Sequence, residues 1–156
     1  MEPRFALPDL NSDLYRRMAA LSSAVDNCGL DRQLLELIKM RASQINGCAY
    51  CIDIHSKDAR ALGETEQRLY ALNAWRETLF YTERERATLA LTEAITLITD
   101  GHVPDAVYEE ARRVFDEKEV GQIIWAAAVI NTWNRLSIAT RAVPGRYQPG
   151  GSADPP

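Results

Sequence analysis

Apolar residues recur at intervals of three and four along almost the whole chain, the spacing that places them on one face of an α-helix. The first stripe of this kind consists of Leu14, Met18, Leu21 and Val25. The sequence contains no convincing alternation of apolar and polar residues over the length of a strand. The pattern therefore predicts an all-α protein.

Caps and helix-breaking residues divide this pattern into about seven predicted helices. We expect them over residues 11–28, 31–46, 48–63, 65–75, 82–100, 104–115 and 116–142. Thr82 and Asp116 each precede a glutamate by three residues, the capping-box pattern that marks a helix start. The second helix carries apolar residues over a broad arc, which indicates deep burial.

The helical pattern ends near residue 143. Residues 144–156 are rich in proline and glycine and hold almost nothing apolar, so we expect a disordered tail there. Residues 1–143 are predicted to form one all-α domain with helix packed on helix, because no linker or repeat divides them. The wide apolar faces of the second and last helices exceed what one small bundle covers, which predicts a homo-oligomer.

Composition narrows the classes of function. The chain has 156 residues, a formal net charge of −4 and no basic stripe, which argues against a nucleic-acid partner. No stretch reaches the roughly 18 apolar residues needed to cross a bilayer, so we expect no membrane partner. The first ten residues lack the apolar core of an export signal, which predicts a cytoplasmic protein.

The sequence holds three cysteines, too few and of the wrong parity for a framework of structural disulfides. Cys28 stands alone and is interpreted as a small, at least half-buried apolar residue. Trp75, Trp125 and Trp133 are interpreted as core or subunit-interface anchors.

The other two cysteines share the start of the predicted 48–63 helix with a histidine, as Cys48-x-x-Cys51-x-x-x-His55. Each helical residue turns by about 100°, so the three side chains fall within about 60° of arc. A helix N-terminus stabilises a thiolate, and His55 can either pair with that thiolate or remove its proton. Two such thiols can attack a peroxide or disulfide and then close a disulfide of their own, which predicts redox chemistry.

Glu36 lies among leucines and isoleucine on the apolar second helix. A buried carboxylate would have a raised pKa suited to proton transfer. The alternative is an ordinary helical ion pair with Arg32 or Lys39.

Two further interpretations stay open. Cys48, Cys51, His55 and Glu36 are ligand types that zinc accepts, although three of them on one helix is an uncommon zinc spacing. Asn131, Asn134 and Arg135 interrupt the apolar last helix. They form either a buried polar network between helices or a group near the cysteines or an interface.

Glu36 stands twelve residues before Cys48, and Cys51 and His55 follow Cys48. The spacing of these four residues resembles the core signature of the AhpD-like alkylhydroperoxidases, within the carboxymuconolactone decarboxylase superfamily. Three flanking segments are also similar to that group, namely residues 37–47, 80–87 and 131–136. The resemblance covers roughly residues 34–142.

This resemblance implies an all-α fold that assembles as trimers or as hexamers. It implies a thiol-dependent peroxidase or disulfide reductase that reduces hydroperoxides in antioxidant defence without a bound cofactor. Cys51 would attack, Cys48 would resolve, and His55 with Glu36 would form a proton relay. The reductant would be a dithiol, on a lipoyl carrier or a thioredoxin-like protein, working alone or beside a peroxiredoxin.

One position departs from the family pattern. Studied members carry a histidine immediately before the second cysteine, where this chain has Tyr50. Tyrosine titrates near 10 and is a poor base at neutral pH, which puts the rate with peroxide and the choice of reductant in question. A redox-sensing oligomer and a lactone decarboxylase of the wider superfamily are the remaining alternatives, although such decarboxylases generally lack the cysteine pair.

Overall fold

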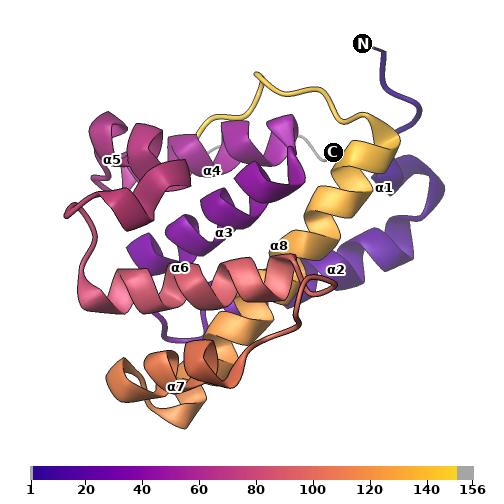
Figure 1. The fold of residues 1–156 in the computed structure, drawn as a ribbon. Helices are drawn as coiled ribbons and strands as arrows, with labels where there is room; N and C mark the ends of the chain where they lie inside the picture. Colours follow the sequence, from indigo (N-terminus) through magenta and orange to yellow (C-terminus); the bar gives the residue numbers. More distant parts are fainter. Residues whose placement is uncertain (1, 151–156) are drawn as a thin grey trace.

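The computed structural model describes residues 2–150 as a bundle of helices (Figure 1). Within that range there are eight α-helices, one 3-10 helix and no strand. In chain order they are α1 (Leu7–Leu10), α2 (Ser12–Asp26), α3 (Arg32–Asn46), α4 (Ala49–Ala61), α5 (Glu66–Ala71), η1 (Leu72–Glu77), α6 (Glu83–Thr96), α7 (Asp105–Val114) and α8 (Glu117–Thr140). The predicted all-α fold is confirmed.

Helix α3 lies at the centre of the bundle and packs against α4, α6 and α8 (Figure 1). Its Leu35, Leu37 and Ile38 are almost completely buried, as the broad apolar arc in the sequence predicted. Burying these three side chains contributes roughly 1.5–3 kcal/mol each through the hydrophobic effect. None of the helices over residues 2–150 is long and apolar enough to cross a membrane.

Local capping explains why several helices begin where the sequence predicted. Thr82 and Asp116 each accept a hydrogen bond from the backbone N–H three residues on, and the glutamate there accepts one back. Asp31 caps α3 in a simpler way by accepting from the N–H of Leu34 at 3.0 Å.

Three boundaries differ from the sequence prediction. Helix α1, a single turn that begins near Pro8, was not predicted because four residues are too few to show a period. The predicted 65–75 helix is α5 followed by the 3-10 helix η1, with a kink at Ala74. Helix α6 ends at Thr96 rather than near residue 100, and turns follow it.

The segment after α8 lies against α4 over the residues that the structure describes. Three hydrogen bonds hold it, from Gly145 N to Asp53 Oδ2 (3.0 Å), from Lys57 Nζ to Tyr147 O (3.0 Å) and from Tyr147 Oη to Asp58 Oδ1 (2.6 Å). The sequence predicted disorder from residue 144, yet residues 144–150 are tied to α4 by these polar contacts. The rest of that predicted tail, residues 151–156, lies outside the described residues.

Candidate active site

A tight turn between α3 and α4 places the cysteine pair. Gly47 ends α3 with φ = 70°, the left-handed conformation that glycine adopts without a steric penalty. The N–H of Cys48 then donates to the carbonyl of Ser43 at 3.0 Å, and Cys48 becomes the N-cap of α4. Its Sγ accepts the N–H of Cys51 at 3.3 Å. The cysteines therefore open a helix, as the sequence predicted.

Buried asparagines of α8 form hydrogen bonds with the end of α3, next to this turn. Asn134 Nδ2 donates to Ser43 Oγ at 3.0 Å, and Asn46 Nδ2 donates to the side-chain oxygens of Asn134 (2.8 Å) and Asn131 (2.9 Å). The amide of Asn131 continues the network to Thr96 of α6. Asn131 and Asn134 thus form a buried network between helices, and that network ends next to the turn that carries Cys48. Arg135 is exposed and joins the network from its edge by donating to Asn131 Oδ1 at 3.0 Å.

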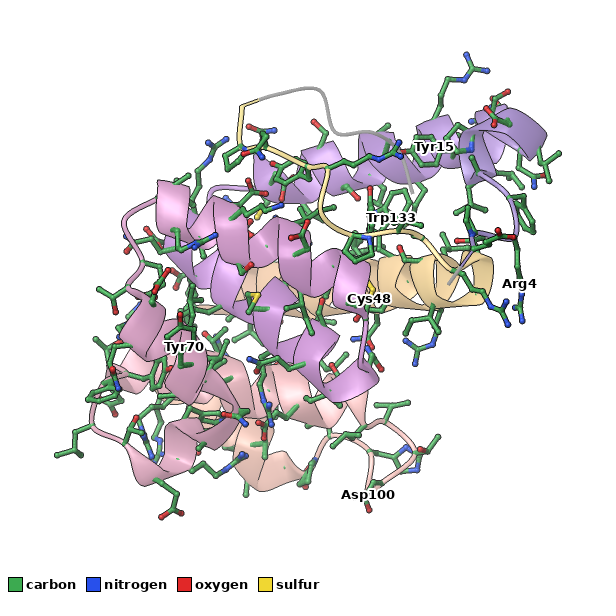
Figure 2. The ribbon with its side chains drawn as sticks, turned by 90° about the horizontal axis from the view of Figure 1, so that it is seen from above. Arg4, Tyr15, Cys48, Tyr70, Asp100 and Trp133 are labelled. Atoms are coloured by element: carbon green, nitrogen blue, oxygen red, sulfur yellow. A yellow bond between two sulfur atoms is a disulfide. The ribbon has the colours of Figure 1, made fainter. Side chains whose placement is uncertain are left out.

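Cys48 and Cys51 form a disulfide, with their Cα atoms 5.4 Å apart. Both residues are buried inside the bundle, whereas Tyr70 and Asp100 lie at its periphery (Figure 2). Cys51 is among the residues that line a cavity of about 170 Å³, and Cys48 is not. The second cysteine is therefore the one that a small molecule in this cavity would meet.

His55 lines the same cavity and belongs to a row of ionisable groups from three helices. Its Nδ1 lies 2.9 Å from Glu36 Oε2. The other carboxylate oxygen of Glu36 accepts from Lys39 Nζ at 2.7 Å, and Lys39 also donates to Asp26 Oδ1 at 2.7 Å. An Nδ1–H that donates to Glu36 leaves Nε2 as the ring nitrogen able to exchange a proton.

Glu36 differs from the buried proton-transfer group that the sequence suggested. Burial acts to raise its pKa, but the charges and hydrogen bonds of His55 and Lys39 outweigh burial and lower the pKa from 4.5 to about 2. The ordinary ion pair was therefore the better interpretation, and its partner is Lys39 rather than Arg32. A carboxylate with so low a pKa stays charged at neutral pH, where its contact with Nδ1 orients the ring of His55.

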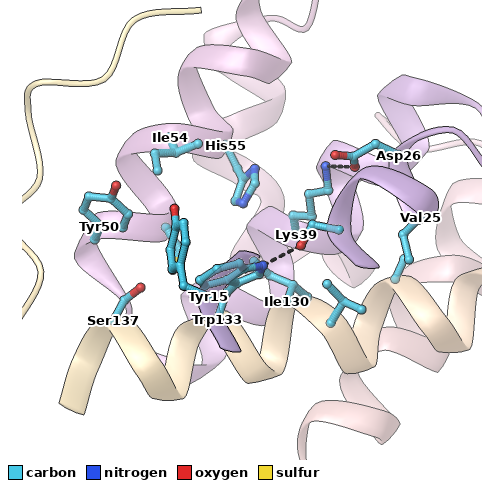
Figure 3. Close-up of a pocket in the computed structure, with 14 residues that line it drawn as sticks. Tyr15, Val25, Asp26, Lys39, Tyr50, Ile54, His55, Ile130, Trp133 and Ser137 are labelled. Atoms are coloured by element: carbon cyan, nitrogen blue, oxygen red, sulfur yellow. Dashed lines mark hydrogen bonds and ion pairs between the residues drawn. The ribbon is translucent and has the colours of Figure 1, made fainter. Parts of the chain in front are cut away.

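The cavity is walled by α2, α3, α4 and α8 (Figure 3). Tyr15 and Trp133 form an edge-to-face pair in its wall, with ring centroids 5.5 Å apart. Trp133 Nε1 donates to Ser22 Oγ at 2.6 Å, which fixes the indole ring. Sequence reasoning took all three tryptophans as core or interface anchors. The buried Trp75 and the partly buried Trp133 both pack in the core. Trp133 also lines the cavity, which only its place opposite α4 could show.

The zinc set that the sequence allowed is not the cluster that the fold assembles. Within residues 2–150, the histidine, cysteine and carboxylate ligand atoms that gather are those of Glu36, His55 and Asp58, all within 4.8 Å of one another. Lys39 Nζ already neutralises the first of these carboxylates. The two sulfurs bond to each other. A metal there would have to replace existing ion pairs rather than fill an unpaired set of ligands.

Comparison with known sequences agrees with this arrangement. The sequence model of the carboxymuconolactone decarboxylase family matches residues 12–94, which include all four signature residues. The chain belongs to the carboxymuconolactone decarboxylase family. The uncharacterised protein YdfG of Bacillus subtilis (strain 168) is 42% identical over 139 residues, or 89% of this chain and 95% of that relative.

Comparison with solved structures shows that this chain is an AhpD-like member of the family. A protein of unknown function from Agrobacterium tumefaciens, named as a candidate antioxidant defence protein AhpD, superposes with a TM-score of 0.91. It is 36% identical, and the match covers 94% of this chain and all of that one. The debrominase Bmp8 shares the fold at a TM-score of 0.76 and 24% identity, over 87% of this chain and 73% of its own. The expected AhpD-like membership is confirmed.

Proposed function

We propose that this family member is a thiol-dependent peroxidase or disulfide reductase that reduces hydroperoxides in antioxidant defence. The observation that carries the proposal is the position of Cys51. It is bonded to Cys48 and lines, together with His55, one apolar cavity. Attacking thiol, resolving thiol and proton acceptor therefore meet in one place.

The cycle balances with a hydroperoxide as the oxidant and a dithiol as the reductant, and the side chains of the site carry the sulfur chemistry and the proton. In the reduced protein His55 takes the proton of the Cys51 thiol, and the thiolate attacks one oxygen of the hydroperoxide. As the S–O bond forms and the O–O bond breaks, the proton passes from His55 to the leaving oxygen. The Cys48 thiol then attacks the sulfenic sulfur, which releases water and closes the disulfide. A dithiol reductant restores both thiols by exchange, so the cycle uses no bound cofactor.

Glu36 acts in this cycle as a fixed charge. Its hydrogen bond to Nδ1 holds the ring of His55, and its negative charge stabilises the imidazolium that forms when Cys51 loses its proton. Glu36 therefore stays in the site as a positioning residue, in place of the second step of a proton relay.

The proposal also includes a homo-oligomer, a cytoplasmic setting and a dithiol reductant. Ile124 and Trp125 of α8 expose 39% and 59% of their surface, which supports a homo-oligomer such as a trimer or hexamer. A cytoplasmic setting fits an exchangeable pair, because thiols are kept reduced there. The proposed reductant is a lipoyl carrier or a thioredoxin-like protein, alone or beside a peroxiredoxin.

Cysteine variants test the proposal directly. We expect Cys51→Ser to abolish consumption of hydrogen peroxide and cumene hydroperoxide with dihydrolipoamide as the reductant. Cys48→Ser should complete one round and leave a sulfenic acid that dimedone traps, because the resolving thiol is gone. Cys28→Ser is the matched control, since this partly buried free cysteine lies outside the pair, and it should keep full activity.

Each other outcome has a definite meaning. A first round that stops in Cys48→Ser and proceeds in Cys51→Ser would reverse the two roles. Peroxide turnover that neither substitution changes would remove the enzyme proposal. A disulfide that forms while little peroxide is consumed with any dithiol would favour a redox sensor, and one zinc per chain in the purified protein would favour the metal site.

A further inference from the structure

Ser137 of α8 carries a hydroxyl that is buried beside the cavity. The residue is 3% exposed, and its Oγ has no hydrogen-bond partner within the described part of the chain. Its side chain lines the cavity that Cys51 and His55 also line. Figure 3 shows Ser137 beside Tyr50, at the end of the cavity away from Val25 and Asp26. A buried hydroxyl without a partner is unfavourable unless something in the cavity bonds to it.

The other unpaired hydroxyls show why this one is different. Thr88 and Thr92 of α6 also bury an Oγ1 without a partner among residues 2–150. A threonine can be retained for the packing of its methyl group, whereas a serine offers nothing beyond its hydroxyl that alanine would lack. Neither threonine lines the cavity, and Ser137 does. A ligand contact therefore accounts for Ser137 in a way that packing does not.

The size and charge of the cavity limit what Ser137 can meet. A volume of about 170 Å³ is close to that of an engineered protein cavity of roughly 150 Å³ that binds benzene. The walls are largely apolar, with Ile54, Ile130 and Trp133 among them. The ammonium of Lys39 is already held by two carboxylates, so it does not favour an anionic ligand. The cavity fits a compact, uncharged and mostly apolar molecule.

We propose that Ser137 is a ligand-binding residue whose hydroxyl hydrogen-bonds a neutral oxygen, a carbonyl or a hydroxyl, on a ring-sized apolar substrate. The apolar body of that substrate occupies the space between α4 and α8, and its reactive group faces Cys51. The claim that the ligand is a substrate rests on the proposed peroxidase or reductase function. The contact itself does not, because the oxidised protein can bind without turnover.

Two ring compounds of similar size test the contact. Acetophenone carries a ketone oxygen and ethylbenzene carries none, and the affinity of each for the oxidised protein is measured by NMR titration. We expect Ser137→Ala to lower the affinity for acetophenone about fivefold, which is the effect of losing one ordinary hydrogen bond. The affinity for ethylbenzene should change by less than about twofold. The matched control Thr92→Val removes a buried unpaired hydroxyl outside the cavity and should change neither affinity.

The outcomes separate this proposal from the proposed function. Equal effects of Ser137→Ala on both compounds, or none on either, would overturn the contact, and failure of the unaltered protein to bind either ring would overturn the ligand class. The variant should fold normally, since the substitution breaks no side-chain hydrogen bond among residues 2–150 and alanine favours helix. Because no turnover is measured, absent peroxide consumption in the unaltered protein would remove the function and leave the contact standing.

Discussion

Replacing Glu36 by glutamine should reveal how much the contacts of its carboxylate with His55 and Lys39 contribute to the free energy of unfolding. The amide keeps the size of the side chain but removes the charge that faces His55 and Lys39 at 2.9 and 2.7 Å. The pKa of Glu36 lies at about 2 instead of 4.5. Each pKa unit corresponds to about 1.4 kcal/mol, so the ionised carboxylate stabilises the fold by about 3 kcal/mol.

The sign of the pH dependence follows from the direction of that shift. A carboxylate whose pKa is lower in the folded state stabilises the fold above its unfolded pKa, and loses this effect as pH falls through the folded pKa. The stabilisation is therefore complete near pH 6 and is lost between about pH 4.5 and pH 2. The gap in unfolding free energy between the unaltered protein and Glu36→Gln should shrink by about 3 kcal/mol over that range.

Urea unfolding at several pH values from 6 to 2, with the disulfide closed in both proteins, measures the gap. Glu109→Gln on α7 is the matched control, because this glutamate is exposed and its substitution should give no comparable gap at any pH. A gap for Glu36→Gln that stays constant across the range would refute the ion-paired carboxylate. It would also refute the orienting role assigned to Glu36.

Three further substitutions test the turn, the buried network and the C-terminal contact that surround the site. Gly47→Ala should cost about 1 kcal/mol in urea unfolding, because φ = 70° strains any residue with a Cβ. Asn134→Ala should cost about 2 kcal/mol or more by leaving buried partners unpaired, while the exposed Thr132→Ala should stay within about 0.5 kcal/mol. Tyr147→Phe should raise the pKa of Asp58 in an NMR titration. Burial already raises that pKa, and the hydroxyl of Tyr147 opposes the rise by stabilising the charge, so a lower or unchanged value would contradict the contact.

Sequence reasoning succeeded where the cause is local. The capping boxes at Thr82 and Asp116 and the turn at Gly47 depend on residues within one helical turn. It failed for the pKa of Glu36, because the groups that decide that pKa include His55, nineteen residues away along the chain. It also missed the contacts of residues 144–150, since composition does not show which surface a polar segment will meet.

The sequence by itself determined the helices, the arc that carries Cys48, Cys51 and His55, and the family, because helical periodicity and motif spacing need no distant partner. Only the tertiary structure decided which cysteine faces the cavity and which charges surround Glu36. Those choices depend on how α2, α4 and α8 pack around α3, and such contacts join residues far apart in the chain. The same packing places Trp133 and Ser137 in the wall of the cavity that Cys51 lines, where the hydroxyl of Ser137 has no partner among the described residues.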